Sequence, residues 1–205
     1  VGAALGTEST ALGVNILLGP GVNIKRSPLG GRNFEYFSED PYLAGKLGAA
    51  YINGVQAQGV GTSLKHYVAN NLETARMWAN SDVDDRTLNE IYLTPFEIAI
   101  REAQPWSVMA CYNRVQGVYG TQSTSLLTDK LKQEWGFEGI VISDWGAVVD
   151  RVEGIRAGLH LEMPGADRDI NNEAVLAAVK SGALEEAEVD RLVRDILRVV
   201  LRANA

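Results

Sequence analysis

Short apolar runs alternate with helical stretches along this chain, and this alternation limits its possible folds more than any other sequence feature. The clearest run, residues 139–143, is β-branched and apolar at successive positions, as expected of a strand buried on both faces of a sheet. Similar runs cover residues 14–18, 61–65, 107–112 and 158–162. Strands that alternate with helices form parallel sheets or barrels. We therefore predict an α/β fold with about five parallel strands.

The segments between these runs carry helix signals. Asp40 followed by Pro41 is typical of an N-cap and first helical residue, which predicts a helix to about residue 58. Asp85 begins a second predicted helix over residues 85–101, in which Pro95 should introduce a kink or a new start. Further helices are predicted over residues 124–135, 172–181 and 185–202.

Two architectures are compatible with this pattern, an open doubly wound sheet and a (β/α)8 barrel with missing pieces. A complete barrel usually needs about 250 residues, and this chain has 205. A nucleotide-binding open sheet would carry a glycine-rich phosphate loop. The Gly19-Pro20-Gly21 turn lacks the GxGxxG spacing, and no GxxxxGK[ST] motif is present, which weakens the nucleotide-binding alternative.

Composition excludes several classes of partner. The formal net charge of −7 provides no basic stripe to neutralise phosphates, which argues against nucleic acid. A single cysteine, Cys111, excludes an internal disulfide framework and a multi-thiolate metal site. No apolar stretch reaches the roughly 18 residues that span a membrane, and no signal peptide is visible after Val1.

Polar side chains lie at or just beyond the predicted strand ends, where α/β folds place their chemistry. The group comprises Lys65, His66, Met109, Tyr112, Asp144 and Trp145, with Arg32 and Arg76 in nearby loops. An ionised carboxylate such as Asp144 can attack an anomeric carbon, and an adjacent indole gives a sugar ring an apolar surface. The cations and imidazole would hydrogen-bond sugar hydroxyls and keep the carboxylate ionised.

Structural roles for the same residues remain open at this point. Asp144 could cap the next helix, and the Lys65-His66 pair could serve the fold alone. Tyr112 could be a half-buried aromatic residue with a satisfied hydroxyl group, while Arg32 and Arg76 could form surface ion pairs.

Five sequence motifs, in this order along the chain, resemble the N-terminal catalytic domain of glycoside hydrolase family 3, in its β-glucosidase branch. They are LGPGVNIKRSPLGGRNFEYFSEDPYL (residues 18–43), SLKHYVANNLETAR (63–76), VMACYNRVQG (108–117), GFEGIVISDWGAV (136–148) and AGLHLEMPG (157–165). They occur in the family's order and span residues 18–165, which is most of the chain. The resemblance implies a TIM-type (β/α)8 barrel that is incomplete at the N-terminus.

The resemblance also implies roles for individual residues. Asp144 matches the catalytic nucleophile, and Trp145 matches the aromatic platform beside it. Arg32, Lys65 and His66 match groups that bind glucose hydroxyls. Arg76, Met109 and Tyr112 match residues that line the pocket. The implied reaction is retaining hydrolysis of terminal β-D-glucosyl residues through a covalent glycosyl-enzyme, with a β-glucoside or small β-linked oligosaccharide as substrate. The resemblance implies that this reaction needs no metal and no organic cofactor.

Two parts of the family pattern are missing from residues 1–205, which implies a partial barrel domain. The first barrel segment carries a sugar-binding Asp, and a C-terminal sandwich domain of the same enzyme supplies the acid/base Glu. Glu39, Glu73, Glu97 and Glu162 do not match that glutamate, and we expect Glu39 and Glu97 to be structural. His160 replaces a residue that is more often acidic in the family.

Alternatives within the family are a β-xylosidase or a dual-specificity β-glycosidase, because sequence does not give pocket volume. The β-N-acetylhexosaminidase branch carries a KHFPGHG-type motif with a second His. This chain has KHYVANN at that place, which argues against that branch. A further alternative is a catalytically incompetent sugar-binding fragment.

Overall fold

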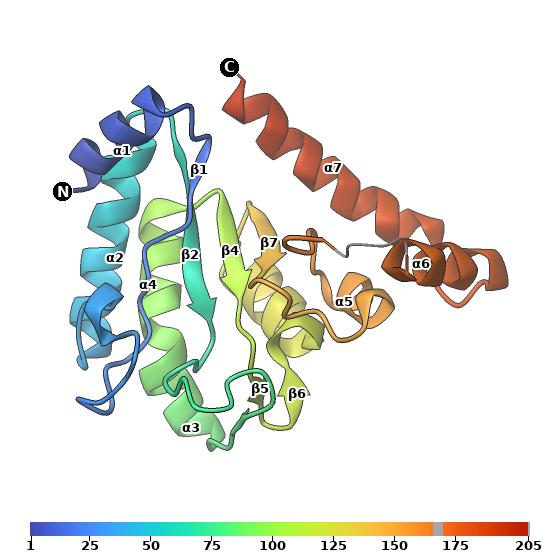
Figure 1. The fold of residues 1–205 in the computed structure, drawn as a ribbon, viewed down its shortest axis with the longest axis horizontal. Helices are drawn as coiled ribbons and strands as arrows, with labels where there is room; N and C mark the ends of the chain where they lie inside the picture. The colour runs from blue at the N-terminus through green and yellow to red at the C-terminus, as the bar shows by residue number, and fades with distance from the viewer. Residues whose placement is uncertain (166–169, 205) are drawn as a thin grey trace.

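A parallel sheet in the order β1-β2-β4-β7 carries the fold (Figure 1). The computed structural model describes residues 1–165 and 170–204. The strands are β1 (Ile16–Leu17), β2 (Gly61–Tyr67), β4 (Ser107–Ala110) and β7 (Ile140–Ser143). A small second sheet contains β3 (Asn80–Ser81), β5 (Arg114–Val115) and β6 (Val118–Tyr119), with β5 central. Each predicted main-sheet strand except residues 158–162 is present, and all neighbours in this sheet are parallel.

Helices alternate with these strands as predicted. The α-helices are α1 (Gly2–Ala11), α2 (Pro41–Gln56), α3 (Asp85–Thr87), α4 (Thr94–Ala103), α5 (Arg151–Ala157), α6 (Ile170–Ser181) and α7 (Glu186–Ala203). Short 3-10 turns form η1 (Asn33–Glu35) and η3 (Gly120–Gln122), and wider π-helical segments form η2 (Leu88–Leu93) and η4 (Ser125–Glu134). The Asp40 carboxylate caps α2 by accepting the Leu43 N–H at 2.7 Å, as the Asp-Pro signal predicted.

Pro95 resets its helix, as predicted. It lies in the first turn of α4, where a missing N–H costs least. The preceding η2 is π-helical, and the Thr94 hydroxyl donates to the Asn89 and Glu90 carbonyls at 2.9 and 2.8 Å. These side-chain bonds replace part of the backbone ladder that the proline interrupts.

The strand predicted over residues 158–162 is wrong. Only an isolated parallel bridge joins Leu161 to Ile142. The reason lies in His160, whose ring Nδ1 accepts the Val141 N–H at 3.0 Å. A side chain thereby takes a donor that a regular ladder would give to a neighbouring carbonyl.

The register brings the carboxyl ends of three strands to one level. Ala110 pairs with Tyr67 on one side and with Ser143 on the other. The residues that directly precede or follow these positions, including His66 and Asp144, therefore meet at one edge of the sheet. In Figure 1 the strand arrows point toward this edge, at the lower side of the view.

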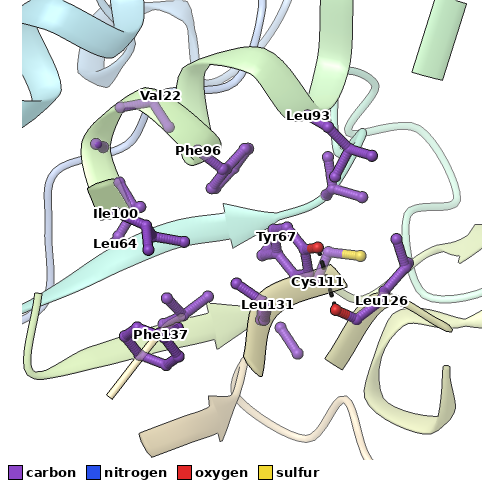
Figure 2. Close-up of a cluster of buried hydrophobic side chains, with 14 of the residues drawn as sticks. Val22, Leu64, Tyr67, Leu93, Phe96, Ile100, Cys111, Leu126, Leu131 and Phe137 are labelled. Carbon is purple, nitrogen blue, oxygen red and sulfur yellow. Dashed lines mark hydrogen bonds between the residues drawn. The ribbon is translucent and has the colours of Figure 1, made fainter. Parts of the chain in front are cut away.

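The main core lies between this sheet and helices α2, α4 and η4. Tyr67 stands at its centre, fully buried, with its ring edge-on to Phe96 and Trp135 at centroid distances of 5.2 and 6.0 Å. Its hydroxyl donates to the Leu126 carbonyl at 3.2 Å (Figure 2). The core therefore fixes β2, whose opposite face carries the site.

Helix α7 runs diagonally beyond β7, from α6 toward the upper side of the view (Figure 1). Its residues Ile196 and Val199 pack on Met109, Ile140 and Ile142. Within the described ranges, none of the helices is both long and apolar enough to cross a membrane.

Candidate active site

Asp144 lies at the carboxyl end of β7 with only 6% of its surface exposed. Its backbone N–H donates to the Ala110 carbonyl at 2.9 Å, which fixes it against β4. Oδ1 accepts the Trp145 N–H at 2.8 Å. Oδ2 is buried and has no hydrogen-bond partner in the described structure. An unpartnered buried carboxylate oxygen is costly for a fold, which points to a ligand-binding or chemical role.

The helix-cap explanation for Asp144 is wrong. Helix α5 begins at Arg151, and the carboxylate that caps it belongs to Asp150, which accepts the Glu153 N–H at 3.0 Å. The sequence signal was ambiguous because two aspartates precede this helix.

His66 faces Asp144 from the end of β2. Its Nε2 lies 3.8 Å from Asp144 Oδ2, too far for a direct hydrogen bond. Burial, and then the charges of Arg32, Lys65 and Arg76, hold the pKa of His66 well below its usual range. The imidazole is therefore neutral near pH 7. The Asn23 side chain clamps its backbone, because Oδ1 accepts the His66 N–H at 2.7 Å and Nδ2 donates to the His66 carbonyl at 2.9 Å.

Arg32 and Lys65 share one counter-ion, Glu35. The Arg32 Nε donates to Glu35 Oε1, and Lys65 Nζ lies 3.2 Å from Oε2. All three side chains are mostly buried. Although burial raises the pKa of Glu35, these two cations outweigh it, and the pKa is lowered overall. Both cations are thus held by a permanent anion rather than exposed at the surface.

Arg76 and Tyr112 form a second contact pair in the group. The Arg76 guanidinium lies 4.5 Å from the centre of the Tyr112 ring, and its Nη1 lies 2.6 Å from Glu73 Oε2. Burial, and then the charge of Asp144, raise the pKa of Tyr112, so its hydroxyl stays protonated. The expected surface pairs of Arg32 and Arg76 therefore exist, but they line the group around Asp144.

Met109 and Trp145 take different positions. Met109 is buried in an apolar cluster with Ile140 and Ile142, below the polar group. Trp145 is 44% exposed and anchored through its backbone to Asp144. The sequence interpretation did not single out Asn23, Glu35 or Tyr36. Glu35 and Tyr36 lie close to Arg32 in sequence, whereas Asn23 makes contacts across 43 positions that no local pattern reveals.

The described ranges contain no group of three or more His, Cys, Asp and Glu side chains that could hold a metal ion. The polar groups gathered here are the Asp144 carboxylate, the neutral imidazole of His66, the Tyr112 phenol, and three cations that are paired with Glu35 and Glu73. This set suits a neutral ligand with many hydroxyl groups, because each hydroxyl can both donate and accept.

A family model described as the glycosyl hydrolase family 3 N terminal domain matches residues 1–199. Among curated relatives, thermostable beta-glucosidase B of Acetivibrio thermocellus is 56% identical over 203 residues. An exo-alpha-(1->6)-L-arabinopyranosidase of Bifidobacterium longum is 49% identical over 205 residues. The matches cover 99% and 100% of this chain but 27% of each relative. The chain thus spans about a quarter of the length of these relatives.

Solved structures agree with this result. Beta-glucosidase 3B from Thermotoga neapolitana, in complex with alpha-D-glucose, superposes with a TM-score of 0.95 at 47% identity, over 98% of this chain and 29% of that one. The GH3 beta-glucosidase of Bifidobacterium adolescentis superposes with a TM-score of 0.95 at 47% identity, over 99% of this chain and 30% of that one. The expected TIM-type barrel fold is confirmed. The alternative architecture, an open nucleotide-binding sheet, is not supported.

Proposed function

This chain belongs to glycosyl hydrolase family 3, and on that premise we propose that it carries the nucleophile side of a retaining β-glucosidase site. Residues 1–205 form part of the barrel domain of a longer enzyme. That enzyme hydrolyses terminal non-reducing β-D-glucosyl residues. The relatives named beta-glucosidases, and a neighbour whose structure holds glucose, support the activity.

The observation that carries the proposal is the buried, unpartnered Oδ2 of Asp144. It faces His66 across 3.8 Å at the carboxyl edge of the sheet. Such an oxygen has a lone pair available for attack on an anomeric carbon. In the first step, Oδ2 bonds to that carbon while the glycosidic bond breaks and its electrons go to the leaving oxygen. In the second step, water attacks the same carbon and gives its proton to the acid/base carboxylate, while the bond from that carbon to Oδ2 breaks and its electrons return to the Asp144 carboxylate.

The surrounding side chains suit the sugar that this reaction needs. We assign Arg32, Lys65 and His66 to the sugar hydroxyls, because Arg32 and Lys65 are held together by Glu35 and His66 faces Asp144. Arg76 and Tyr112, which contact each other, line the pocket in this proposal. Trp145 provides a half-exposed ring at the rim, and Met109 supports the floor from the apolar cluster.

The acid that protonates the leaving group comes, in this proposal, from the C-terminal sandwich domain of the same enzyme. A general acid needs a carboxyl group whose pKa is raised. Glu35 has the opposite environment, with a lowered pKa between two cations. Glu73 is paired with Arg76, and Glu97 is paired with Arg101 on the surface of α4. The Glu162 carboxylate accepts two bonds from Asn171.

The test is covalent trapping with 2,4-dinitrophenyl 2-deoxy-2-fluoro-β-D-glucoside, followed by intact-mass analysis. Its leaving group needs little protonation, so the reagent probes the nucleophile without the acid. We expect one sugar adduct, mapped to Asp144 and absent in Asp144→Asn. Asp129→Ala, which removes an exposed carboxylate, should react like the wild type. A folded protein without an adduct, or with an adduct on another residue, would overturn the assignment.

Pentopyranosides are the second candidate substrates. Two relatives, each 49% identical over the whole chain, are named exo-alpha-(1->6)-L-arabinopyranosidases. A pocket that accepts a hexopyranose has room for a pentopyranose, which lacks the exocyclic hydroxymethyl group. Parallel trapping with 2-fluoro derivatives of β-glucose, β-xylose and α-L-arabinopyranose would rank the three sugars. A binding-only fragment would show sugar affinity in calorimetry and no adduct with any of them.

A further inference from the structure

His66 has two ring nitrogens, and the described structure gives each a different neighbour. Nδ1 lies 3.0 Å from the Tyr36 hydroxyl, within hydrogen-bond distance. Nε2 faces the unpartnered Oδ2 of Asp144. A neutral imidazole carries its proton on only one nitrogen. The choice of tautomer therefore decides whether Asp144 faces an N–H donor or a lone pair at Nε2.

Tyr36 is held in place for this contact. It is 6% exposed, and its ring stands edge-on to the imidazole, with a centroid distance of 6.0 Å and an interplanar angle of 74°. A Cβ on Gly21 would lie 2.8 Å from two ring carbons of Tyr36, so only glycine leaves space for the ring. The Asn23 clamp fixes the His66 backbone from the same loop.

We propose that Tyr36 is a positioning residue that donates its hydroxyl proton to His66 Nδ1 and thereby keeps the imidazole proton on Nε2, toward Asp144. If the Tyr36 hydroxyl accepted a hydrogen bond from Nδ1–H instead, the hydroxyl proton would have no acceptor. Among the described residues, His66 Nδ1 is the only hydrogen-bond partner of this hydroxyl. Buried donors are rarely left unpaired. The opposite tautomer would also aim the Nε2 lone pair at a carboxylate oxygen.

Burial supports this assignment at both groups. It raises the pKa of Tyr36, so the phenol keeps its proton at any working pH. It is also the largest cause that keeps the pKa of His66 low, so the imidazole stays neutral and has a tautomer to fix. An N–H at Nε2 can donate to a sugar hydroxyl while that hydroxyl donates to Asp144. This last consequence rests on the proposed function, whereas the tautomer is a property of the protein alone.

The experiment is a long-range ¹H–¹⁵N correlation spectrum of the imidazole rings, without sugar. The chain has 2 histidines, so His66→Gln assigns the signals by loss of one set. We expect wild-type His66 to have a protonated Nε2 and a bare Nδ1. In Tyr36→Phe the ring should populate the other tautomer. The matched control is Tyr67→Phe, which also removes a buried hydroxyl but one that bonds to Leu126, and it should leave His66 unchanged.

A wild-type spectrum with the proton on Nδ1, or one that Tyr36→Phe does not change, would overturn the proposal. The wild-type measurement decides the question even if the variant fails to fold. Trapping by the fluoroglucoside should also slow about tenfold in Tyr36→Phe, because His66 loses the Nε2–H that donates to the sugar hydroxyl. If the tautomer is found but no adduct forms in the wild type, the positioning role stands and the glycosidase proposal fails.

Discussion

Glu35 shows how one residue can organise a group of cations that would otherwise repel one another. It contacts both Arg32 and Lys65 from the loop that also carries Tyr36. Because its side chain is 19% exposed, water screens the two interactions only in part. The shared anion lets two positive groups lie close together without a high cost in electrostatic repulsion.

We expect Glu35→Gln to weaken sugar binding rather than chemistry. Without the shared charge, Arg32 and Lys65 repel and lose their fixed positions, so the reagent concentration at half-maximal trapping rate should rise about tenfold. The limiting rate at saturation should change much less. Glu97→Gln, which breaks an ion pair with Arg101 on the exposed side of α4, should have no effect on either quantity. An unchanged half-saturation in Glu35→Gln would contradict this role.

At this scale the sequence locates some residues of the candidate site and misses others for a physical reason. Lys65, His66 and Asp144 were found because strand ends can be recognised from local apolar runs. Asn23 and Tyr36 act on His66 across 43 and 30 positions. Their contacts depend on how the chain returns to β2, which no local spacing shows.

Helix α2 is the element whose start was most readable from sequence. Its first turn is closed by the Asp40 carboxylate, which accepts the Leu43 N–H on the surface. Buried residues such as Ala44 and Ile52 then hold the helix against the sheet. Cap and packing are separate contributions, so the cap can be removed alone.

Asp40→Ala should lower the free energy of unfolding by about 1 kcal/mol, the usual value of an N-cap side chain. Asp40→Ser keeps an oxygen for the same N–H and should recover most of the loss. Urea denaturation of the three proteins, with equal slopes, would measure both effects. A loss much above this range would show that Asp40 does more than cap α2.

The elements that the sequence did not predict share one property, which is that their boundaries are set by other segments. The small sheet has strands of two residues, too short to show any period. Helix α1 is rich in Gly, Ala, Ser and Thr and has no clear apolar stripe. Residues 158–162 have strand composition, but the ring of His160 competes for the ladder.

For the whole molecule, His160 also matters because it connects the sheet to α7. Its Nδ1 accepts from Val141, and its Nε2 lies 3.3 Å from Asp195 Oδ2 on α7. Lys132 and Arg198 face the same carboxylate at 3.8 and 2.8 Å. Burial, and then the charge of Lys132, lower the pKa of His160 to about 4, against the opposing effect of Asp195.

This pKa predicts acid sensitivity. Between about pH 4 and pH 6.5 the unfolded chain binds a proton at His160 that the folded chain does not, so stability falls as pH falls through that window. From pH 7 to pH 5 the loss from this group is on the order of 2 kcal/mol. The lowered pKa of Asp195 keeps its own titration below the window. His66 contributes a loss of the same sign.

His160→Asn keeps an oxygen for the Val141 N–H but has no titrating ring. Its loss of unfolding free energy between pH 7 and pH 5 should therefore be smaller than that of the wild type by about 2 kcal/mol. Urea titrations at both pH values give the two differences. Equal losses in both proteins would show that His160 titrates normally in the folded state.

The contacts of α7 also determine the order in which this polypeptide can assemble during synthesis. The Asn15 amide donates to the Ala203 carbonyl at 3.4 Å, across 188 positions of sequence. The ribosome releases the amino-terminal partner long before its carboxyl-terminal one exists. The apolar face formed by Met109, Ile140 and Ile142 therefore stays uncovered until α7 has been synthesised. Such a surface is what chaperones bind, so the emergence of α7 sets the period for which this part of the nascent chain needs protection.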